Sequence, residues 1–140
     1  MIYIFSAFYA EAKNIIDHYD LKKEKSLETV RFDVFANDDI RLVITGVGEI
    51  NAAAAVSNIG GAYGISPDDE ILNVGCGACF SSETCLGSIF LGNKLTEQMT
   101  GRTFYPDMLM KTGYRECEII TAVRVLNEGS DSVVYDMEAA

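Results

Sequence analysis

The sequence predicts an α/β fold, a three-layer α/β/α sandwich built around a mixed central sheet. Short apolar runs typical of buried strands alternate along the chain with two segments of helical character. No internal repeat or low-complexity linker interrupts this alternation. The composition is globular, with 49% hydrophobic and 23% charged residues. Since a domain contains ~150 residues, residues 1–140 are predicted to form a single domain.

The chain begins with a predicted strand and an amphipathic helix. Residues 1–6 are a short apolar, aromatic-rich run typical of a buried strand. Ser6 is a candidate N-cap for the helix that follows. Apolar side chains then recur at helical spacing and form one stripe: Phe8, Ala12, Ile15, Ile16 and Tyr19. Glu11 flanks this stripe, so its carboxylate is predicted to face the sheet edge rather than open water.

A hairpin and a second helix follow. Residues 29–36 alternate well enough for a strand, and an Asn-Asp-Asp turn joins them to a second strand at 40–45. Gly46-Val47-Gly48 breaks the strand pattern, and residues 49–63 are predicted to be helical. Small side chains that would let this helix lie close on a sheet share one face: Ala53, Ala54, Ser57, Gly60 and Gly61.

The rest of the chain is mainly strand. The further predicted strands are 70–74, 88–96, 118–123 and 132–135. Residues 136–140, Asp-Met-Glu-Ala-Ala, are predicted to begin a helix. The resulting order, β-α-β-β-α-β-β-β-β-(α), favours a mixed sheet with helices packed on it.

The charge balance limits the choice of partner. The 11 basic and 21 acidic residues give a net charge of −10, whereas a nucleic-acid surface needs a basic face. No run approaches the ~20 apolar residues of a membrane helix. The N-terminus also lacks the basic segment of a secretory signal. The sequence therefore predicts a cytoplasmic protein without a nucleic-acid or membrane partner.

Metal and dinucleotide sites are not predicted. Cys76-Gly77-Ala78-Cys79 has C-x-x-C spacing, but a zinc site would need a second such pair or a histidine pair. His18 is the only histidine. Gly46-Val47-Gly48 lacks the third glycine of the dinucleotide fingerprint, because position 51 is Asn. We predict no metal and no organic cofactor.

Three segments carry side chains suited to ligand binding. The loop at 73–78 follows a predicted strand, where open α/β sheets bind ligands. In the loop at 100–107, Arg102 could pair with an anion, and Phe104 or Tyr105 could stack on a flat ring. A carboxylate near 136–138 could accept hydrogen bonds from two sugar hydroxyls. An ordinary turn, a surface loop and an acidic first helical turn explain the same three patterns.

Together these pieces resemble the nucleoside phosphorylase and nucleosidase superfamily, and most closely its methylthioadenosine/S-adenosylhomocysteine nucleosidase branch. The resemblance extends over essentially the whole chain and is weakest between about 95 and 130. It rests on Ser6-Ala7 with Glu11, Thr45-Gly46-Val47-Gly48, Asn73-Val74-Gly75-Cys76-Gly77-Ala78 and Tyr135-Asp136-Met137-Glu138-Ala139. The last segment is the most specific, because it resembles the family's Met-Glu-Ala signature. A homodimer is implied by the same resemblance.

The resemblance also implies roles for individual residues. Glu11 matches the carboxylate that positions and activates the attacking water, the catalytic role. Met137 and Glu138 match the ribose contacts, with Glu138 on the 2′ and 3′ hydroxyls. Cys76, Gly77 and Ala78 match the loop that borders sugar and base, although the family commonly has serine where this chain has Cys76.

Hydrolysis of a purine nucleoside is favoured over phosphorolysis. The phosphorylase branches place basic residues near the end of the first strand to bind phosphate, whereas residues 6–12 contain none and include Glu11. A phosphorylase with Arg102 as the phosphate partner remains the alternative enzyme. A non-catalytic nucleoside-binding domain is the alternative from another class.

The chain differs from the family pattern in the residue that protonates the leaving group. In the family, a strand after the Met-Glu-Ala helix delivers an aspartate that protonates the purine. By the resemblance, no residue of 1–140 takes that role. The expectation is a fold incomplete at its C-terminus, and a nucleosidase-like chain without its leaving-group acid.

Overall fold

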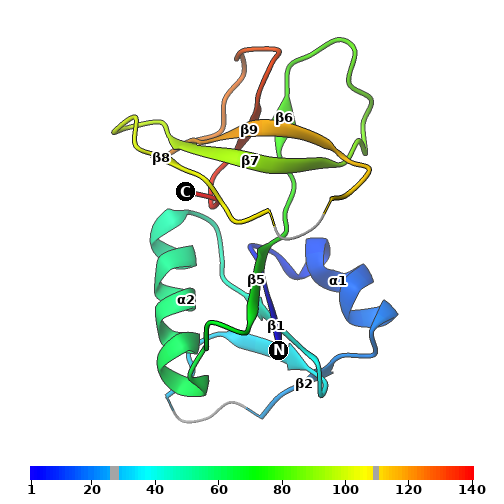
Figure 1. Cartoon of the computed structure of the whole chain (residues 1–140), viewed down its shortest axis with the longest axis vertical. Coiled ribbons are helices and arrows are strands. Elements are labelled where there is room, and N and C mark those ends of the chain that lie inside the picture. The colour runs from blue at the N-terminus through cyan, green and yellow to red at the C-terminus, as the bar shows by residue number, and fades with distance from the viewer. Residues whose placement is uncertain (26–28, 109–110) are drawn as a thin grey trace. The chain divides into compact units, whose positions relative to one another are not determined.

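The computed structural model describes residues 1–25, 29–108 and 111–140 and divides into two compact units (Figure 1). The N-terminal unit is Met1–Cys76 and the C-terminal unit is Gly77–Ala140. The elements of the N-terminal unit are β1 (Ile2–Ser6), α1 (Tyr9–His18), β2 (Lys22–Lys23), β3 (Asp33–Ala36), β4 (Ile40–Ile44), α2 (Glu49–Tyr63) and β5 (Glu70–Asn73). Those of the C-terminal unit are β6 (Ala78–Cys79), β7 (Phe90–Glu97), β8 (Thr103–Phe104), β9 (Arg115–Thr121) and β10 (Val134–Asp136).

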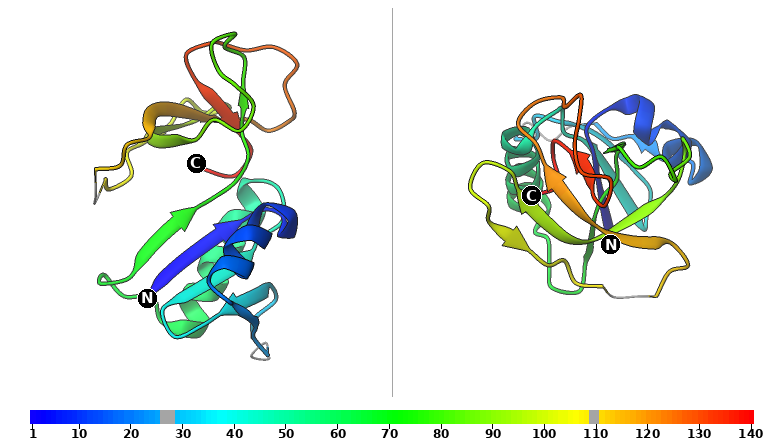
Figure 2. Two further views of the ribbon diagram at one scale, coloured as in Figure 1. Left: turned by 90° about the vertical axis from the view of Figure 1, so that its right-hand side faces the viewer. Right: turned by 90° about the horizontal axis from the view of Figure 1, so that it is seen from above.

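The N-terminal unit contains a mixed sheet in the order β2-β3-β4-β1-β5. Strand β1 runs parallel to both β4 and β5, and Phe5 lies in register with Val43 on one side and Asn73 on the other. Strand β3 is antiparallel to β4, as expected for a hairpin. Figure 2 shows β1 and β5 side by side from a second direction. The three parallel strands therefore end at one edge of the sheet.

The two helices of this unit cover opposite faces of its sheet (Figure 1). Because side chains alternate along a strand, β1 contributes to a core cluster on each face. The cluster on the α2 side is Tyr3, Phe5, Val30, Val34, Val43, Ala55 and Ile59. The cluster on the α1 side is Ile4, Ala12, Ile16, Leu21, Ile40 and Leu42. The predicted α/β/α layering is thus present in the N-terminal unit.

The C-terminal unit contains a second mixed sheet, in the order β6-β10-β9-β7-β8. Its central strands β10, β9 and β7 run parallel, and the outer strands β6 and β8 are antiparallel to their neighbours. The sequence predicted one central sheet, whereas the described strands belong to two. Strand order along a chain does not reveal this division, because pairing is decided by contacts distant in sequence. That both units belong to one domain stays a prediction.

Most predicted elements are confirmed, including the hairpin and the helix at 49–63. The predicted helix start at 136–140 is wrong, because β10 continues through Asp136 and the next residues form a bend. Ser6 is not the N-cap of α1, since that position is Phe8. Three short strands were missed, namely β2, β6 and β8. Two-residue strands are defined by their partners and carry almost no signal of their own.

The face of α2 that packs on the sheet also differs from the prediction. Ala55 and Ile59 are buried there, whereas small residues expected on that face, such as Ala54 and Ser57, are exposed. The helix ends as predicted at Gly64, whose φ of 73° suits glycine. Helical periodicity fixed the length of α2 but not which stripe faces inward.

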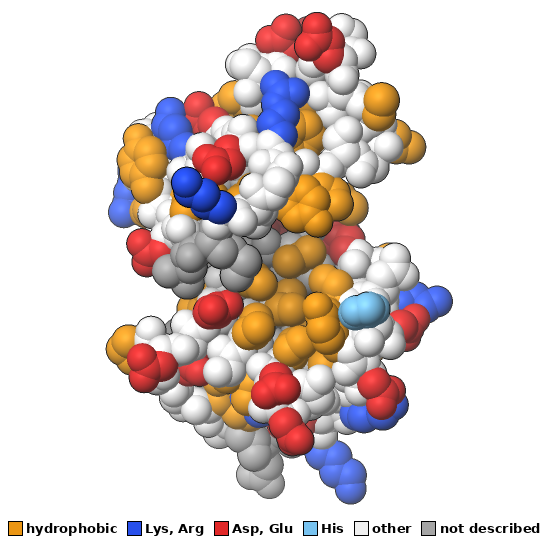
Figure 3. Space-filling view, turned by 45° about the vertical axis from the view of Figure 1, so that its right-hand side comes forward, with side chains coloured by type: hydrophobic (Ala, Val, Ile, Leu, Met, Phe, Trp, Pro, Cys, Tyr) orange, Lys and Arg blue, Asp and Glu red, His pale blue; other side chains and the backbone are white. Residues whose placement is uncertain are grey.

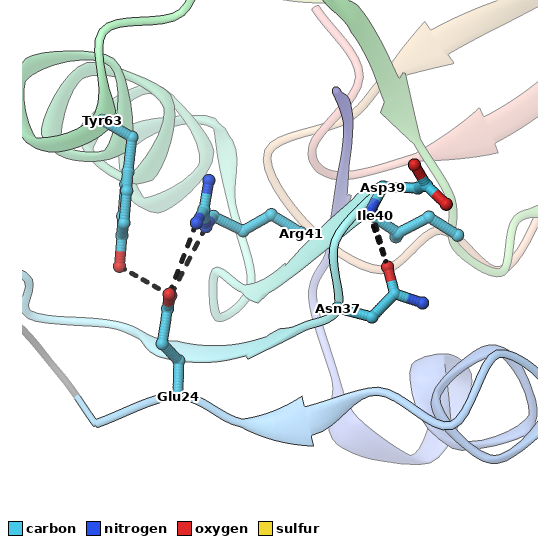
Figure 4. A network of polar contacts seen from close by, with 6 residues as sticks. All are labelled: Glu24, Asn37, Asp39, Ile40, Arg41 and Tyr63. Atoms are coloured by element: carbon cyan, nitrogen blue, oxygen red, sulfur yellow. Dashed lines mark hydrogen bonds and ion pairs between the residues drawn. The ribbon is translucent and has the colours of Figure 1, made fainter.

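A polar network stabilises the N-terminal unit near the start of β4 (Figure 4). The Glu24 carboxylate accepts hydrogen bonds from Tyr63 Oη at 2.8 Å and from the Arg41 guanidinium at 3.3 and 3.4 Å. The Arg41 guanidinium also lies 3.9 Å from the centroid of the Tyr63 ring. Burial raises the pKa of Glu24, but the hydrogen bonds from Tyr63 and Arg41 outweigh it, so the pKa lies below its usual value.

The surface carries charges of both signs. On the face shown in Figure 3, basic side chains stand in small groups between acidic ones. Within residues 1–25, 29–108 and 111–140, no helix is long and apolar enough to cross a membrane. In the same described ranges, no group of His, Cys, Asp and Glu side chains is arranged to hold a metal ion.

Candidate functional site

The edge where the parallel strands of the N-terminal unit end brings three polar segments together. Thr45 N–H, just after β4, donates to the Ser6 carbonyl at 2.9 Å. Val74 N–H, just after β5, donates to the Phe5 carbonyl at 2.9 Å. Chain segments that follow parallel strands leave the sheet at a common edge, which is where α/β folds bind ligands. Ser6 and Thr45 are both buried there.

Glu11 spans this edge from the first turn of α1. Its Oε2 accepts hydrogen bonds from Ser6 Oγ at 3.3 Å and from Phe8 N–H at 3.2 Å. Its Oε1 accepts from Cys76 N–H at 3.0 Å. The side chain is half-buried. One carboxylate is therefore held between the ends of β1 and β5 by three hydrogen-bond donors.

The Cys76 thiol lies beside this carboxylate. Burial, and then the negative charge and hydrogen bonding of Glu11, raise the pKa of the thiol. A thiol with a raised pKa stays protonated and is a poor nucleophile or metal ligand.

The glycine turn after β4 is a strand-to-helix connection. Gly46 and Gly48 have φ angles of 81° and 100°, which favour glycine. Gly46 N–H donates to the Ala7 carbonyl at 3.2 Å, and Asn51 Nδ2 donates to the Val47 carbonyl at 2.7 Å. The Gly46 N–H group is thus already used within the fold, as expected for a structural turn.

The rest of the 76–78 loop lies in the C-terminal unit. A Cβ added at Gly77 would lie 2.4 Å from Val134 Cγ1 and 3.0 Å from the Tyr135 carbonyl oxygen. Glycine is therefore required because β10 passes so close. Ala78 is in β6 and pairs with Tyr135. Contact with β10, rather than ligand approach, explains Gly77 in this structure.

Arg102 and Tyr105, on either side of β8, and Phe104 within β8 are all exposed. The Arg102 guanidinium lies 5.3 Å from the centroid of the Phe104 ring, a cation–π contact. Tyr105 is 73% exposed. The structure brings Arg102 and Phe104 together at an exposed part of the C-terminal unit.

Met137 and Glu138 follow β10 in a half-buried bend. Met137 N–H donates to Glu138 Oε2 at 3.3 Å. Immediately before them, the Asp136 Oδ1 accepts a hydrogen bond from Thr121 Oγ1 at 2.8 Å. Sequence reasoning missed Thr121, whose only signal was a hydroxyl inside the apolar run Ile119-Ile120-Thr121-Ala122.

Comparison with solved structures identifies the fold. One match is the 5'-methylthioadenosine/S-adenosylhomocysteine nucleosidase from Neisseria meningitidis, solved in complex with methylthio-immucillin-A. The TM-score is 0.79 and the sequence identity is 14%, and the match covers 99% of this chain and 75% of that one. The chain has the fold of these nucleosidases. The Colwellia psychrerythraea nucleosidase in complex with adenine matches with a TM-score of 0.79 and 16% identity, over 98% and 72%.

A futalosine hydrolase mutant from Helicobacter pylori shares this nucleosidase fold. It matches with a TM-score of 0.76 and 11% identity, over 98% of this chain and 78% of that one. No protein-family profile matches the chain, and no curated protein matches it by sequence. The relationship is therefore one of three-dimensional structure.

Within the nucleosidase fold, the predicted site residues form three groups. Glu11 and Cys76 are in contact in the N-terminal unit. Met137 and Glu138 are adjacent after β10, and Arg102 lies over the exposed Phe104 ring, which is in β8 rather than in the predicted loop. The role of each group stays a prediction.

Proposed function

We propose that this chain is a nucleosidase-like N-ribosyl hydrolase that acts on a purine nucleoside. The observation that carries the proposal is the Glu11 carboxylate, held at the edge of the sheet by Ser6, Phe8 and Cys76 in a nucleosidase fold. A carboxylate in this arrangement can orient a water molecule and accept its proton.

The proposed reaction consumes one water molecule. Glu11 accepts a proton from water while the water oxygen bonds to the anomeric carbon. The N-glycosidic bond breaks, and its electron pair goes to the purine nitrogen, through an oxocarbenium-like transition state. The leaving nitrogen takes a proton from solvent water, and Glu11 returns its proton to solvent, so that one water molecule is consumed in total. Met137 and Glu138 are proposed as the ribose contacts, and Cys76, Gly77 and Ala78 as the loop bordering sugar and base.

Hydrolysis is favoured because the groups described around Glu11 are neutral donors. Phosphate would face the Glu11 charge, and binding it requires cations or several free N–H groups. Arg102, the candidate phosphate partner, contacts Phe104 in the C-terminal unit. Release of purine that depends on added phosphate would instead support a phosphorylase.

The test is the Glu11→Gln variant with methylthioadenosine as substrate and the nucleoside analogue 5-methylthiotubercidin, a ligand of a solved nucleosidase of this fold, as binding probe. Gln keeps the shape of the side chain but cannot accept the proton from water. We expect purine release to fall by on the order of 100-fold or more, the usual contribution of a general base. Binding of the probe, measured by calorimetry, should change by less than about threefold.

The matched control is Glu70→Gln, in the same unit at the start of β5. It should leave purine release unchanged. Wild-type chain that binds the probe but releases no purine would replace the hydrolase proposal with a nucleoside-binding domain. Wild-type chain that binds neither probe nor substrate would overturn both.

Two further properties are proposed on the sequence resemblance and composition alone. The protein is proposed to be a homodimer, which light scattering of the purified chain tests. A cytoplasmic location is also proposed, and fractionation of cells that produce the protein tests it.

A further inference from the structure

The segment that follows β10 is held by one buried side chain, Thr121 at the end of β9. Thr121 is fully buried, with 0% of its surface exposed. Its hydroxyl donates to Asp136 Oδ1 at 2.8 Å and accepts the Ala140 N–H at 2.9 Å. Thr121 and Asp136 are also register partners in the parallel β9–β10 pair. One hydroxyl therefore contacts both ends of the bend formed by residues 136–140.

Asp136 accepts hydrogen bonds from several residues of the bend. Its carboxylate accepts backbone hydrogen bonds from Glu138 and Ala139 in addition to the Thr121 hydroxyl. Its backbone carbonyl accepts the Ala122 N–H at 2.8 Å. Burial raises the pKa of this carboxyl, the hydrogen bonds oppose that shift, and the neighbouring charge of Glu138 adds to it. A half-buried carboxylate that accepts several donors fixes the backbone around it.

The bend carries the two residues proposed to contact ribose. Strand β10 ends at Asp136, so Met137 and Glu138 have left the sheet and its ladder of hydrogen bonds. Their backbone path is set by the contacts of Thr121 and Asp136 on either side of them. A ligand contact works only when its side chain is held in the productive geometry by surrounding hydrogen bonds.

We infer that Thr121 and Asp136 are positioning residues, which hold Met137 and Glu138 in the orientation that binds the ribose of a nucleoside. This inference rests on the proposed function for its ligand. It assigns no contact between Thr121 or Asp136 and the substrate. Both residues act through the backbone of the bend.

The experiment compares Thr121→Val with Thr121→Ser by calorimetry. Valine keeps the buried shape of threonine and removes both hydrogen bonds, whereas serine retains the hydroxyl. With methylthio-immucillin-A, which carries a ribose-like ring, we expect Thr121→Val to weaken binding about tenfold, because part of the binding free energy is spent on ordering the released bend. Thr121→Ser should stay within about threefold of wild type, and adenine, which has no sugar, should bind all three chains alike.

The matched control is Thr96→Val in the same sheet. Thr96 Oγ1 donates to Glu118 Oε1 at 2.6 Å, a hydroxyl–carboxylate pair that does not touch the bend. This variant should bind both probes as wild type does. Equal weakening of both probes in Thr121→Val, or the same selective loss in Thr96→Val, would overturn the positioning role, since either result indicates a general loss of structure.

Hydrogen exchange separates this inference from the proposed function. In the free chain, Thr121→Val should speed exchange of the Ala140 amide, whose acceptor is lost, relative to Thr96→Val. Failure of the wild type to bind either probe would refute the proposed function. Unchanged exchange of the Ala140 amide in Thr121→Val would refute the claim that Thr121 holds the bend, independently of any ligand.

Discussion

The two units of the chain are stabilised in different ways. The N-terminal unit has two helices over a sheet, and both described core clusters lie in it. The described part of the C-terminal unit has no helix, and its buried apolar side chains are Ala122, Val133 and Val134. Sheet pairing and side-chain hydrogen bonds, such as Thr121 with Asp136, therefore carry more of its structure.

This difference matters for the two halves of the proposed chemistry. Glu11 lies in the first turn of a helix whose Ala12 and Ile16 are buried in the core, so its backbone is fixed by apolar packing, and hydrogen bonds then orient its carboxylate. Met137 and Glu138 sit on a bend held by polar contacts. Hydrogen bonds are directional but individually weak, at about 0.5–1.5 kcal/mol net, whereas a buried core is the sum of many contacts. The bend should therefore respond more to single polar substitutions.

The largest expected effect comes from the core of the N-terminal unit. Leu42 is fully buried, so Leu42→Ala should lower the free energy of unfolding by about 2–5 kcal/mol through lost burial and a cavity. Leu91→Ala, at a half-buried position in β7, should lower the free energy of unfolding by less than half as much as Leu42→Ala. Urea unfolding followed by circular dichroism measures both. Equal losses of unfolding free energy in the two variants would show that both units depend equally on buried apolar side chains.

A second substitution tests close packing in the C-terminal unit. A Cβ at Gly77 would meet Val134 Cγ1 at 2.4 Å and the Tyr135 backbone at 3.0 Å, so Gly77→Ala should lower the free energy of unfolding by about 1–3 kcal/mol. Gly113→Ala is the control, because nothing lies within 4 Å of its added Cβ. A Gly77→Ala chain as stable as that control would show that β6 and β10 are not closely packed.

The smallest expected effects are pH-dependent changes in stability, and the first concerns Glu24 in the N-terminal unit. The lowered pKa of Glu24 means that its contribution to stability is present above the unfolded value of 4.5 and is lost as pH falls through the folded value. Glu24→Gln should therefore be less stable than wild type at about pH 7, and the difference should shrink toward about pH 3. Thermal unfolding midpoints across this range measure it.

Glu118→Gln is the matched variant in the C-terminal unit. Hydrogen bonds from Thr96 and Lys94 lower the pKa of Glu118. Lys94 is more exposed than Arg41, so solvent screens its pairing more strongly and the pH-dependent contribution of Glu118 should be smaller. A larger effect at Glu118 would reverse the comparison.

Local patterns in the sequence anticipated much of the fold and one part of the candidate site. The stripe of α1 buries Ala12 and Ile16 as predicted, whereas its two end members Phe8 and Tyr19 are exposed. Glu11 lies at the sheet edge, as predicted. The inward stripe of α2 was wrong, because its uniformly small and apolar residues give little contrast between faces. Ser6 was expected to cap α1 but donates to Glu11 instead.

The sequence by itself determined the α/β class, the hairpin, the two helices and a carboxylate after the first strand. Apolar periodicity and glycine turns are local signals, readable within a few residues. Only the tertiary structure decided that the described strands form two sheets, that Cys76 N–H holds Glu11, and that Thr121 contacts both ends of the bend at 136–140. Those contacts join residues 15 to 65 positions apart, and local patterns carry no information about which distant donor meets which acceptor.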